Sequence, residues 1–360
     1  MFHKIQEAVR LLNHDYMQSF TVNAESRAQD LQKISSYLEE KCQQDGTEFV
    51  YGRGRRKSKN QKYLELFQRF RERQVTYNWH MASFQGRNNY CKTDPDATFM
   101  HMKDDHMRNA QLKPGYNIQI GIDSEYIVSA DVFQDRDDVW TLVPFLKMMD
   151  EKLGFRYPSV TADSGYESEE GYTYLRSSGQ KPYIKPKTYE KWKKRSFKQD
   201  ISKRENMGYD KETDTYTCHA GKKLKALFVK KQKSKSGYES EVTVYECDGC
   251  TYCPHKEKCT RAKGNKRLYI SKSFLEKRQE SYENILSETG IQYRMNRSIQ
   301  VEGAFGVLKN DYEFQRFLLR GKTKVKLEIL LLCMGYNLNK LHAKIQKGRT
   351  RTYLFEVQSA

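Results

Sequence analysis

Apolar residues recur at helical spacing in the first 42 residues of the chain. Two stripes follow this spacing, formed by Ile5, Val9 and Leu12 and by Leu31, Ile34 and Leu38. A further helix is predicted over residues 61–84, after a polar break and a basic, glycine-containing segment. The first part of the chain is therefore expected to be helical.

From residue 112 the pattern changes to the alternation of β-strands. Tyr116, Ile118 and Ile120 alternate with polar residues, Asp123 begins a turn, and residues 126–128 return as a second strand. Before this hairpin, TDPDATFM (residues 93–100) is predicted to be a turn, because the residue before proline disfavours helix.

An amphipathic helix is predicted over residues 135–154, followed by a short buried strand over residues 160–162. An acidic, tyrosine-rich helix comes next, and PYIKPK (residues 182–187) then forms another strand. An antiparallel hairpin followed by a crossover helix and a parallel strand indicates a mixed α/β sheet.

From residue 189 the chain has a different character. Residues 189–268 are rich in Lys, Glu, Ser and Tyr and contain short β-like pieces, which indicates an insertion with its own small core. Helical spacing returns over residues 281–309, and residues 322–347 form a final helix. The side of this helix expected to be mostly buried carries Val325, Ile329, Leu332, Met334, Leu338 and Leu341.

These patterns divide the chain into five parts. They are a helical region with a basic arm (1–86, arm 52–59), a first part of the core (87–188), a cysteine-rich insertion (189–268), a helical second part of the core (269–347) and a tail (348–360).

The charge composition of the chain indicates that its partner is a polyanion. The 360 residues contain 64 Lys and Arg against 46 Asp and Glu, a net charge of +18. Such an excess is typical of nucleic-acid-binding proteins. The longest apolar tract, residues 329–335, is too short to cross a bilayer, and the N-terminus lacks the apolar core of a signal peptide. We therefore expect a cytoplasmic protein without membrane contact, whose eight cysteines are reduced thiols or metal ligands.

Asp163 stands where the strand over residues 160–162 ends, on a Ser-Gly turn into a helix. Open α/β sheets place their chemistry at such carboxyl ends of strands. Asp is also a preferred helix cap, and local sequence alone favours that role.

A second carboxylate, Glu302, lies in RMNRSIQVEGAFGVLKNDYEFQRFLLRG. Helical geometry places Arg294, Glu302 and Lys309 close to one face, while Ile299, Ala304 and Leu308 belong to the packed side. Taken alone, a glutamate among cations on a helix indicates a surface ion pair worth under about 1 kcal/mol.

ADSGYESEEGYTYL and RSIQVEGAFGVLKNDYEFQRFLLRG together resemble the second-Asp and Glu blocks of DDE transposases from bacterial insertion sequences. KTDPDATFMHMKDDHMRNAQLKPGYNIQIGID is similar to the middle block of that family, and GRGRRKSKNQKYLE precedes it there too. The resemblance covers residues 51–341 and is looser in the cysteine-rich part. It implies an RNase H-like mixed sheet with flanking helices, and cut-and-paste transposition by DNA strand cleavage and strand transfer.

The resemblance also implies cofactors and partners. They are two Mg²⁺ or Mn²⁺ ions, the double-stranded DNA of the element's terminal inverted repeats and of the target, and a homo-oligomer when two ends are synapsed. The expected location is then the nucleoid. Two carboxylates a few Å apart repel by roughly 4 kcal/mol at an effective dielectric of 20, so a site that gathers them needs a cation.

By this resemblance Asp163 and Glu302 are catalytic metal ligands, and Lys309 contacts phosphate. The arginine that some members carry four residues before the Glu is Ser298 here, and Arg297 is its expected substitute. The residues expected to contact DNA are Arg53, Arg55, Arg56, Lys57, Lys59, Arg294, Arg297 and Lys309.

The chain departs from the family at the first catalytic Asp, which members carry on a strand in an Asp-Gly-Thr context upstream of the basic arm. The only Asp-Gly-Thr here begins at Asp45, in a polar break with no apolar strand before it. Asp94, Asp96 and Asp123 are the other candidates, and each fits poorly. We expect an N-terminally truncated copy that is inactive alone. The alternative is a non-catalytic, basic, zinc-stapled nucleic-acid-binding protein.

Five cysteines gather in the insertion. Cys247, Cys250, Cys253 and Cys259 follow the spacing C-x2-C-x2-C-x5-C, and Cys218 precedes them. With His255 also available, the group exceeds the four ligands of structural zinc. The clustering favours Zn²⁺ over unliganded thiols, and an iron–sulfur cluster fits less well because the fourth spacing differs.

Overall fold

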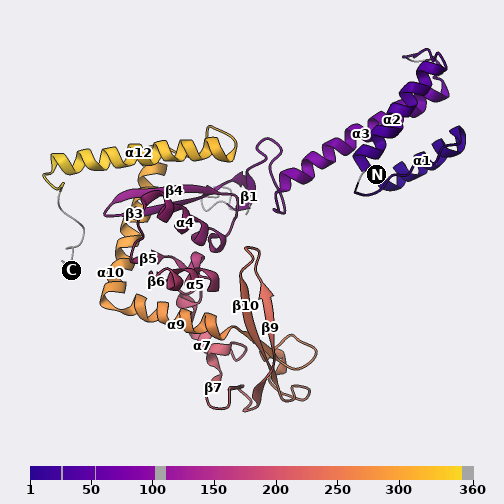
Figure 1. Ribbon diagram of the computed structural model, residues 1–360. Helices are drawn as coiled ribbons and strands as arrows, with labels where there is room; N and C mark the ends of the chain where they lie inside the picture. Colours follow the sequence, from indigo (N-terminus) through magenta and orange to yellow (C-terminus); the bar gives the residue numbers. More distant parts are fainter. Residues whose placement is uncertain (26, 53, 102–110, 351–360) are drawn as a thin grey trace. The chain divides into compact units, whose positions relative to one another are not determined.

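The computed structural model describes residues 1–25, 27–52, 54–101 and 111–350 (Figure 1). The chain divides into two compact units, Met1–Pro95 and Asp96–Ala360. The finer division expected from the sequence stays a prediction.

In the part of the first unit that the structure describes, there are three helices, α1 (Phe2–Tyr16), α2 (Arg27–Gln44) and α3 (Lys59–Phe84), which confirms the helical periodicity of this region. Both predicted apolar stripes lie in its core, where Ile5, Leu12 and Leu31 are fully buried together with Phe67 of α3. Ser58 precedes α3, and its hydroxyl accepts a hydrogen bond from the Gln61 amide at 3.2 Å and so caps the helix.

The second unit begins with two antiparallel pairs of strands. β1 (Thr98–His101) pairs with β2 (Leu112–Gly115), and β3 (Asn117–Asp123) pairs with β4 (Tyr126–Phe133). The β3–β4 hairpin is the one that alternation predicts. The turn predicted over residues 93–100 is wrong at its end, because the residues from Thr98 onward pair with β2, a partner that local sequence does not reveal.

A crossover then leads to a parallel pair of strands. The chain passes through η1 (Asp138–Trp140), α4 (Leu142–Leu153) and β5 (Ser159–Ala162). It continues through η2 (Ser164–Tyr166), α5 (Glu169–Ser177) and β6 (Lys181–Ile184). β5 and β6 pair in parallel, and α4 and α5 pack on them through a core formed by Leu142, Phe145, Leu146, Met149, Tyr172, Leu175 and Ile184.

A five-stranded antiparallel sheet follows, in the order β11-β10-β9-β8-β7 (Figure 1). Its strands are β7 (Gly208–Asp210), β8 (Thr215–Thr217), β9 (Lys223–Lys233), β10 (Glu239–Cys247) and β11 (Arg267–Ile270). Short helical turns flank the sheet, namely α6 (Tyr189–Trp192), α7 (Arg195–Lys198), η3 (Arg204–Asn206) and α8 (Lys256–Cys259). The sequence indicated pieces of β8 and β10 but not β9, whose residues are almost all exposed and lysine-rich.

The C-terminal part of the second unit is helical. It contains α9 (Lys272–Leu286), α10 (Glu288–Arg297), the π-helical turn η4 (Ser298–Glu302), α11 (Gly303–Gly306), a second π-helical turn η5 (Val307–Asp311) and α12 (Lys322–Gln346). With the paired strands, these helices confirm the mixed α/β class.

α12 corrects the expected buried face of the last helix. Val325 and Ile329 are buried against the β3–β4 hairpin as predicted, and Leu332 is partly buried. Met334, Leu338 and Leu341, in contrast, are 55%, 60% and 42% exposed. A two-stranded hairpin covers only a narrow stripe of the helix, and Cys333 and Tyr336 continue that stripe instead. Among the described residues, no helix combines the length and apolar character needed to cross a bilayer.

Candidate active site

Asp163 directly follows the last residue of β5 and caps η2. Its Oδ1 accepts a hydrogen bond from the Gly165 amide at 2.8 Å. The capping role that local sequence favours is therefore present, but it uses only one carboxylate oxygen. The side chain remains 39% exposed, and Oδ2 points to a cation.

That cation is Arg297, at the end of α10. One guanidinium nitrogen, Nη2, lies 3.3 Å from Asp163 Oδ2, and the other, Nη1, lies 3.8 Å from Glu302 Oε1. Two carboxylates from distant parts of the sequence therefore contact the same guanidinium group. Glu302 is the more exposed of the two, at 68%.

The helix that carries Glu302 is not a regular α-helix. Residues Ser298–Glu302 and Val307–Asp311 form π-helical turns on either side of α11. A π turn inserts extra residues into the helical repeat and is frequent at functional sites. Ala304 and Leu308 are buried as predicted, but Ile299 is 65% exposed, so its expected place on the packed side is wrong. The first π turn changes the angular positions that an α-helical repeat assigns.

A polar network that the sequence did not single out supports Asp163. Asp138 Oδ1 accepts hydrogen bonds from Asn117 Nδ2 at 2.8 Å and from Gln119 Nε2 at 3.1 Å. Tyr166 in η2 donates its hydroxyl proton to Gln119 Oε1. The network joins β3, η1 and η2, and therefore fixes the turn on which Asp163 stands.

Gly165 lies between the carboxylates of Asp138 and Asp163. A Cβ atom at Gly165 would lie 3.0 Å from Asp138 Oδ2 and 3.0 Å from Asp163 Oδ1. The pKa of Tyr166 is raised well above its usual value, mainly by burial and further by the negative charges of Asp138 and Asp163. The side of the site next to β3 is therefore acidic.

The oxygen atoms of the two carboxylates are suitable ligands for a hard divalent cation. Asp163 and Glu302 offer carboxylate oxygens, the ligands that Mg²⁺ and Mn²⁺ prefer, and both are accessible. Within the described residues, however, no three His, Cys, Asp or Glu side chains are arranged so that they could hold a metal ion. Arg297 supplies the positive charge between the two carboxylates instead.

The three other aspartates considered for the first catalytic position have different surroundings. Asp96 Oδ2 accepts a hydrogen bond from the Lys322 amide at 2.9 Å and so caps the start of α12. Asp123 lies at the exposed turn of the β3–β4 hairpin, and Asp94 belongs to the first unit, where it is buried and forms a β-bridge with Cys91.

The cations predicted to bind DNA lie in both units. In the basic arm, Arg55 and Arg56 are exposed, whereas Lys57 and Lys59 form ion pairs with Glu65 and Asp15 at 2.6 and 2.9 Å.

Arg53 lies outside the described residues. In the second unit, Arg294 is partly buried and its guanidinium carbon lies 5.9 Å from the centre of the Tyr189 ring. Lys309 is exposed on η5.

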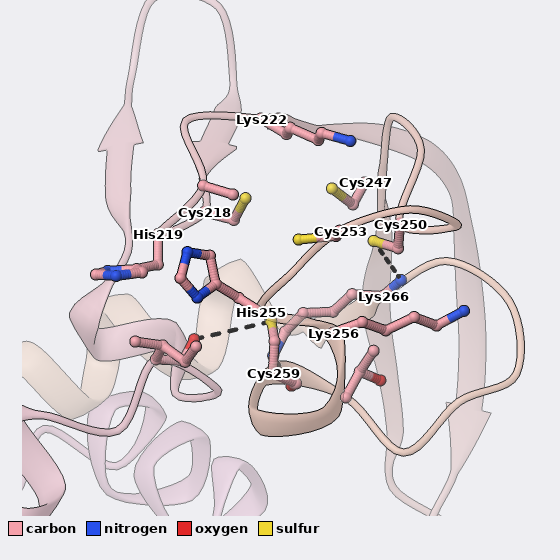
Figure 2. Close-up of a pocket in the computed structure, with 13 residues that line it drawn as sticks. Cys218, His219, Lys222, Cys247, Cys250, Cys253, His255, Lys256, Cys259 and Lys266 are labelled. Carbon is pink, nitrogen blue, oxygen red and sulfur yellow. Dashed lines mark hydrogen bonds between the residues drawn. The ribbon is translucent and has the colours of Figure 1, made fainter.

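The cysteines expected in the insertion gather around one cavity beside the five-stranded sheet, and Figure 2 shows them with the neighbouring histidines. All eight cysteines of the chain are free thiols. The lining thiols are those of Cys218, Cys247, Cys250, Cys253 and Cys259.

Comparison with known families gives one match. Residues 217–342 match a family model described as a transposase DDE domain. The matched segment runs from the end of β8 into α12, so it contains Glu302 and the five clustered cysteines, whereas Asp163 precedes it. Over these residues the match supports the resemblance to DDE transposases drawn from the sequence. Searches of curated proteins and of solved structures gave no match.

Proposed function

We propose that this protein carries out metal-dependent DNA strand cleavage and strand transfer at the ends of an insertion sequence. The observation that carries the proposal is the meeting of Asp163 and Glu302 at Arg297. These carboxylates stand 139 positions apart, and they are the two that the family blocks assign to catalysis. A chance surface ion pair would not be expected to join those two residues.

The proposed architecture is RNase H-like. An antiparallel hairpin, β3–β4, a crossover through α4, and a parallel pair, β5–β6, support this interpretation. In it, Asp163 occupies the carboxyl end of β5, and the helical segment after α9 carries Glu302 toward the same edge. The cysteine-rich sheet would then be an insertion between these two parts of the core.

Asp163 and Glu302 are the residues that would hold Mg²⁺ or Mn²⁺. When bound, such ions activate a water or a DNA 3′-hydroxyl and stabilise the leaving oxygen of an in-line displacement. The chain's own part is to position the carboxylates. Gly165 and the Asp138 network fix Asp163, and Arg297 keeps the two carboxylates together until a stronger cation replaces it.

The proposed substrates are the terminal inverted repeats of the element and its target DNA. Arg55, Arg56 and Lys309 are exposed cations suited to the phosphate backbone. Because two DNA ends must be joined in one reaction, the active assembly would contain at least two copies of the chain. We propose the nucleoid as its location, because the proposed DNA substrates lie there.

The test is strand nicking of labelled DNA with Mg²⁺ or Mn²⁺, together with Mn²⁺ binding followed by electron paramagnetic resonance. Asp163→Asn and Glu302→Gln should each abolish nicking and weaken Mn²⁺ binding while leaving DNA binding unchanged. Glu288→Gln is the matched control, because this exposed carboxylate lies on α10, outside the site. Nicking that persists in both site variants would overturn the proposal.

A non-catalytic nucleic-acid-binding protein is the second candidate, favoured by the net charge of +18 and the cysteine-lined cavity. It predicts salt-sensitive DNA binding by the unmutated chain with neither nicking nor Mn²⁺ binding. The same experiment therefore separates the two functions.

A further inference from the structure

A small cavity in the second unit is lined by five of the eight cysteines of the chain. Its volume is about 20 Å³, and its walls include the five clustered cysteines together with His219 and His255 (Figure 2). A cavity of about 10–15 Å³ already admits one water molecule. The space therefore suits a single ion and excludes an organic ligand.

Two tight turns bring the cysteines to this cavity. After β8, the Gly221 amide donates to the Cys218 carbonyl at 2.9 Å, and Gly221 has a φ of +73°. After β10, the Gly249 amide donates to the Cys247 carbonyl at 3.0 Å, and Gly249 has a φ of +84°. Positive φ angles of this kind are accessible to glycine without strain. Each turn reverses the chain direction next to a cysteine, which is the arrangement of the short cysteine-containing turns that bind structural metals.

One of the sulfur atoms, that of Cys250, has a hydrogen-bond donor that would favour a thiolate. The Lys266 backbone amide donates a hydrogen bond to Cys250 Sγ at 3.4 Å. The Lys266 side chain is buried, and its ammonium group donates to the carbonyls of Ser202 and Cys259 at 2.7 and 2.8 Å. Amide donors and nearby cations lower the energy of thiolate ligands and orient them. Lys266 therefore places a positive charge beside the group of thiols.

Cys218 and Cys250 come from two different parts of the sheet. Cys218 directly follows β8, and Cys250 lies three residues after the end of β10. Both side chains line the cavity, so they bring the ends of two strands to it (Figure 2).

We propose that this cavity is a structural zinc site in which Cys218 and Cys250 are ligands and two more thiols from Cys247, Cys253 and Cys259 complete a tetrahedron. Thiolate sulfur selects Zn²⁺ over Mg²⁺ or Ca²⁺, and structural zinc is four-coordinate. The described side chains do not form a finished coordination shell, so the ion draws the sulfurs together as it binds.

The site has a clear structural purpose. The sheet encloses a small core, formed mainly by Met207, Tyr216, Leu224, Tyr245 and Ile270. Small cores supply little stability and commonly need a metal or a disulfide. Zinc would tie the ends of β8 and β10 to the α8 turn, so it would stabilise the sheet without taking part in DNA chemistry.

The test uses the full chain, purified in a reducing buffer and reconstituted with Zn²⁺. Elemental analysis should find one zinc per chain, and replacement by Co²⁺ should give the visible spectrum of tetrahedral thiolate coordination. The double variant Cys218→Ser/Cys250→Ser should lose the metal. Cys42→Ser/Cys333→Ser is the matched control, because these two cysteines are buried outside the cavity, and it should keep one zinc.

Several outcomes would overturn the proposal. They are a zinc content near zero after reconstitution, a cobalt spectrum without thiolate coordination, zinc retained by the Cys218/Cys250 variant, or iron with an iron–sulfur absorption spectrum. The Co²⁺ spectrum is recorded on the unmutated chain, so it remains informative if a variant fails to fold. Asp163→Asn should keep its zinc, which separates this site from the proposed catalytic one.

Discussion

Glu125 lies in the turn of the β3–β4 hairpin, yet its side chain is only 18% exposed because α12 lies over it. Lys344 and Lys340 of α12 approach its carboxylate to 2.9 and 3.4 Å. Burial raises the pKa of Glu125, but the two ammonium groups lower it by more, so the pKa lies below its ordinary value of 4.5. A carboxyl group with a lowered pKa stabilises the folded state when ionised.

This carboxylate makes stability depend on pH in a defined window. Its contribution is complete above pH 4.5 and is lost as the pH falls through the lowered pKa. Glu125→Gln should lower the free energy of unfolding at neutral pH by about 2 kcal/mol, since Lys344 is left buried without its charged partner. The difference should shrink on acidification.

Urea unfolding from neutral to acidic pH measures this effect. Glu7→Gln, on the exposed side of α1, is the control and should follow the unmutated protein throughout. A Glu125→Gln difference that stays constant with pH would contradict the assignment.

Only some residues of the candidate site could be predicted from the sequence. Asp163 and Glu302 could be paired from the sequence because both lie in long family blocks. Gln119 and Asp138 could not be assigned to the site from the sequence. Gln119 alternates with apolar residues in β3, and alternation assigns such polar positions to the solvent, whereas it is 4% exposed because η1 and η2 cover it. Contacts between elements, not local pattern, make Gln119 part of the site.

At the scale of elements, the junction between α9 and α10 determines where Arg297 and Glu302 lie. Ser287 caps α10 by accepting a hydrogen bond from the Gly290 amide at 3.1 Å. A Cβ atom at Gly290 would lie 1.9 Å from the Asn284 carbonyl oxygen and 2.8 Å from the Ile285 Cα. Both neighbours are backbone atoms, so they can move only if the two helices separate.

Gly290→Ala should therefore destabilise the second unit by about 1–3 kcal/mol or more, as expected for overpacking against backbone. Gly335→Ala is the matched control, because it lies in α12 with no atom within 4 Å of the added Cβ. A helical glycine with open space at its Cβ position should gain about 0.5–1 kcal/mol when replaced by alanine. Denaturant unfolding measures both, and changes of the same sign in the two variants would refute the role of the junction.

Prediction from the sequence succeeded for elements with strong periodicity and failed where a partner decides the structure. The β3–β4 hairpin and the long helices were predicted because their pattern is local. β9 was missed since only Leu224 of its eleven residues is buried, and it is held by pairing along β10. The exposure of part of the apolar face of α12 was not predicted, because it depends on how wide a surface the packed hairpin covers, and local sequence does not show this.

For the whole molecule, the excess of positive charge predicts how binding to DNA responds to salt. Each phosphate neutralised by a cation releases counterions, so the logarithm of the binding constant falls linearly with the logarithm of salt concentration. Arg55 and Arg56 are exposed in the basic arm, and α3 begins only at Lys59, so the arm can follow a phosphate backbone without unfolding a helix.

Arg55→Gln/Arg56→Gln should weaken DNA binding similarly for unrelated sequences and reduce the salt slope by about 2, since each arginine neutralises one phosphate. Lys41→Gln/Arg176→Gln removes the same charge from cations already paired with Asp45 and Glu276, so its slope should stay close to that of the unmutated protein. Fluorescence anisotropy over a salt series measures both. Equal slopes for the two double variants would show that net charge, and not the arm, governs the binding of DNA.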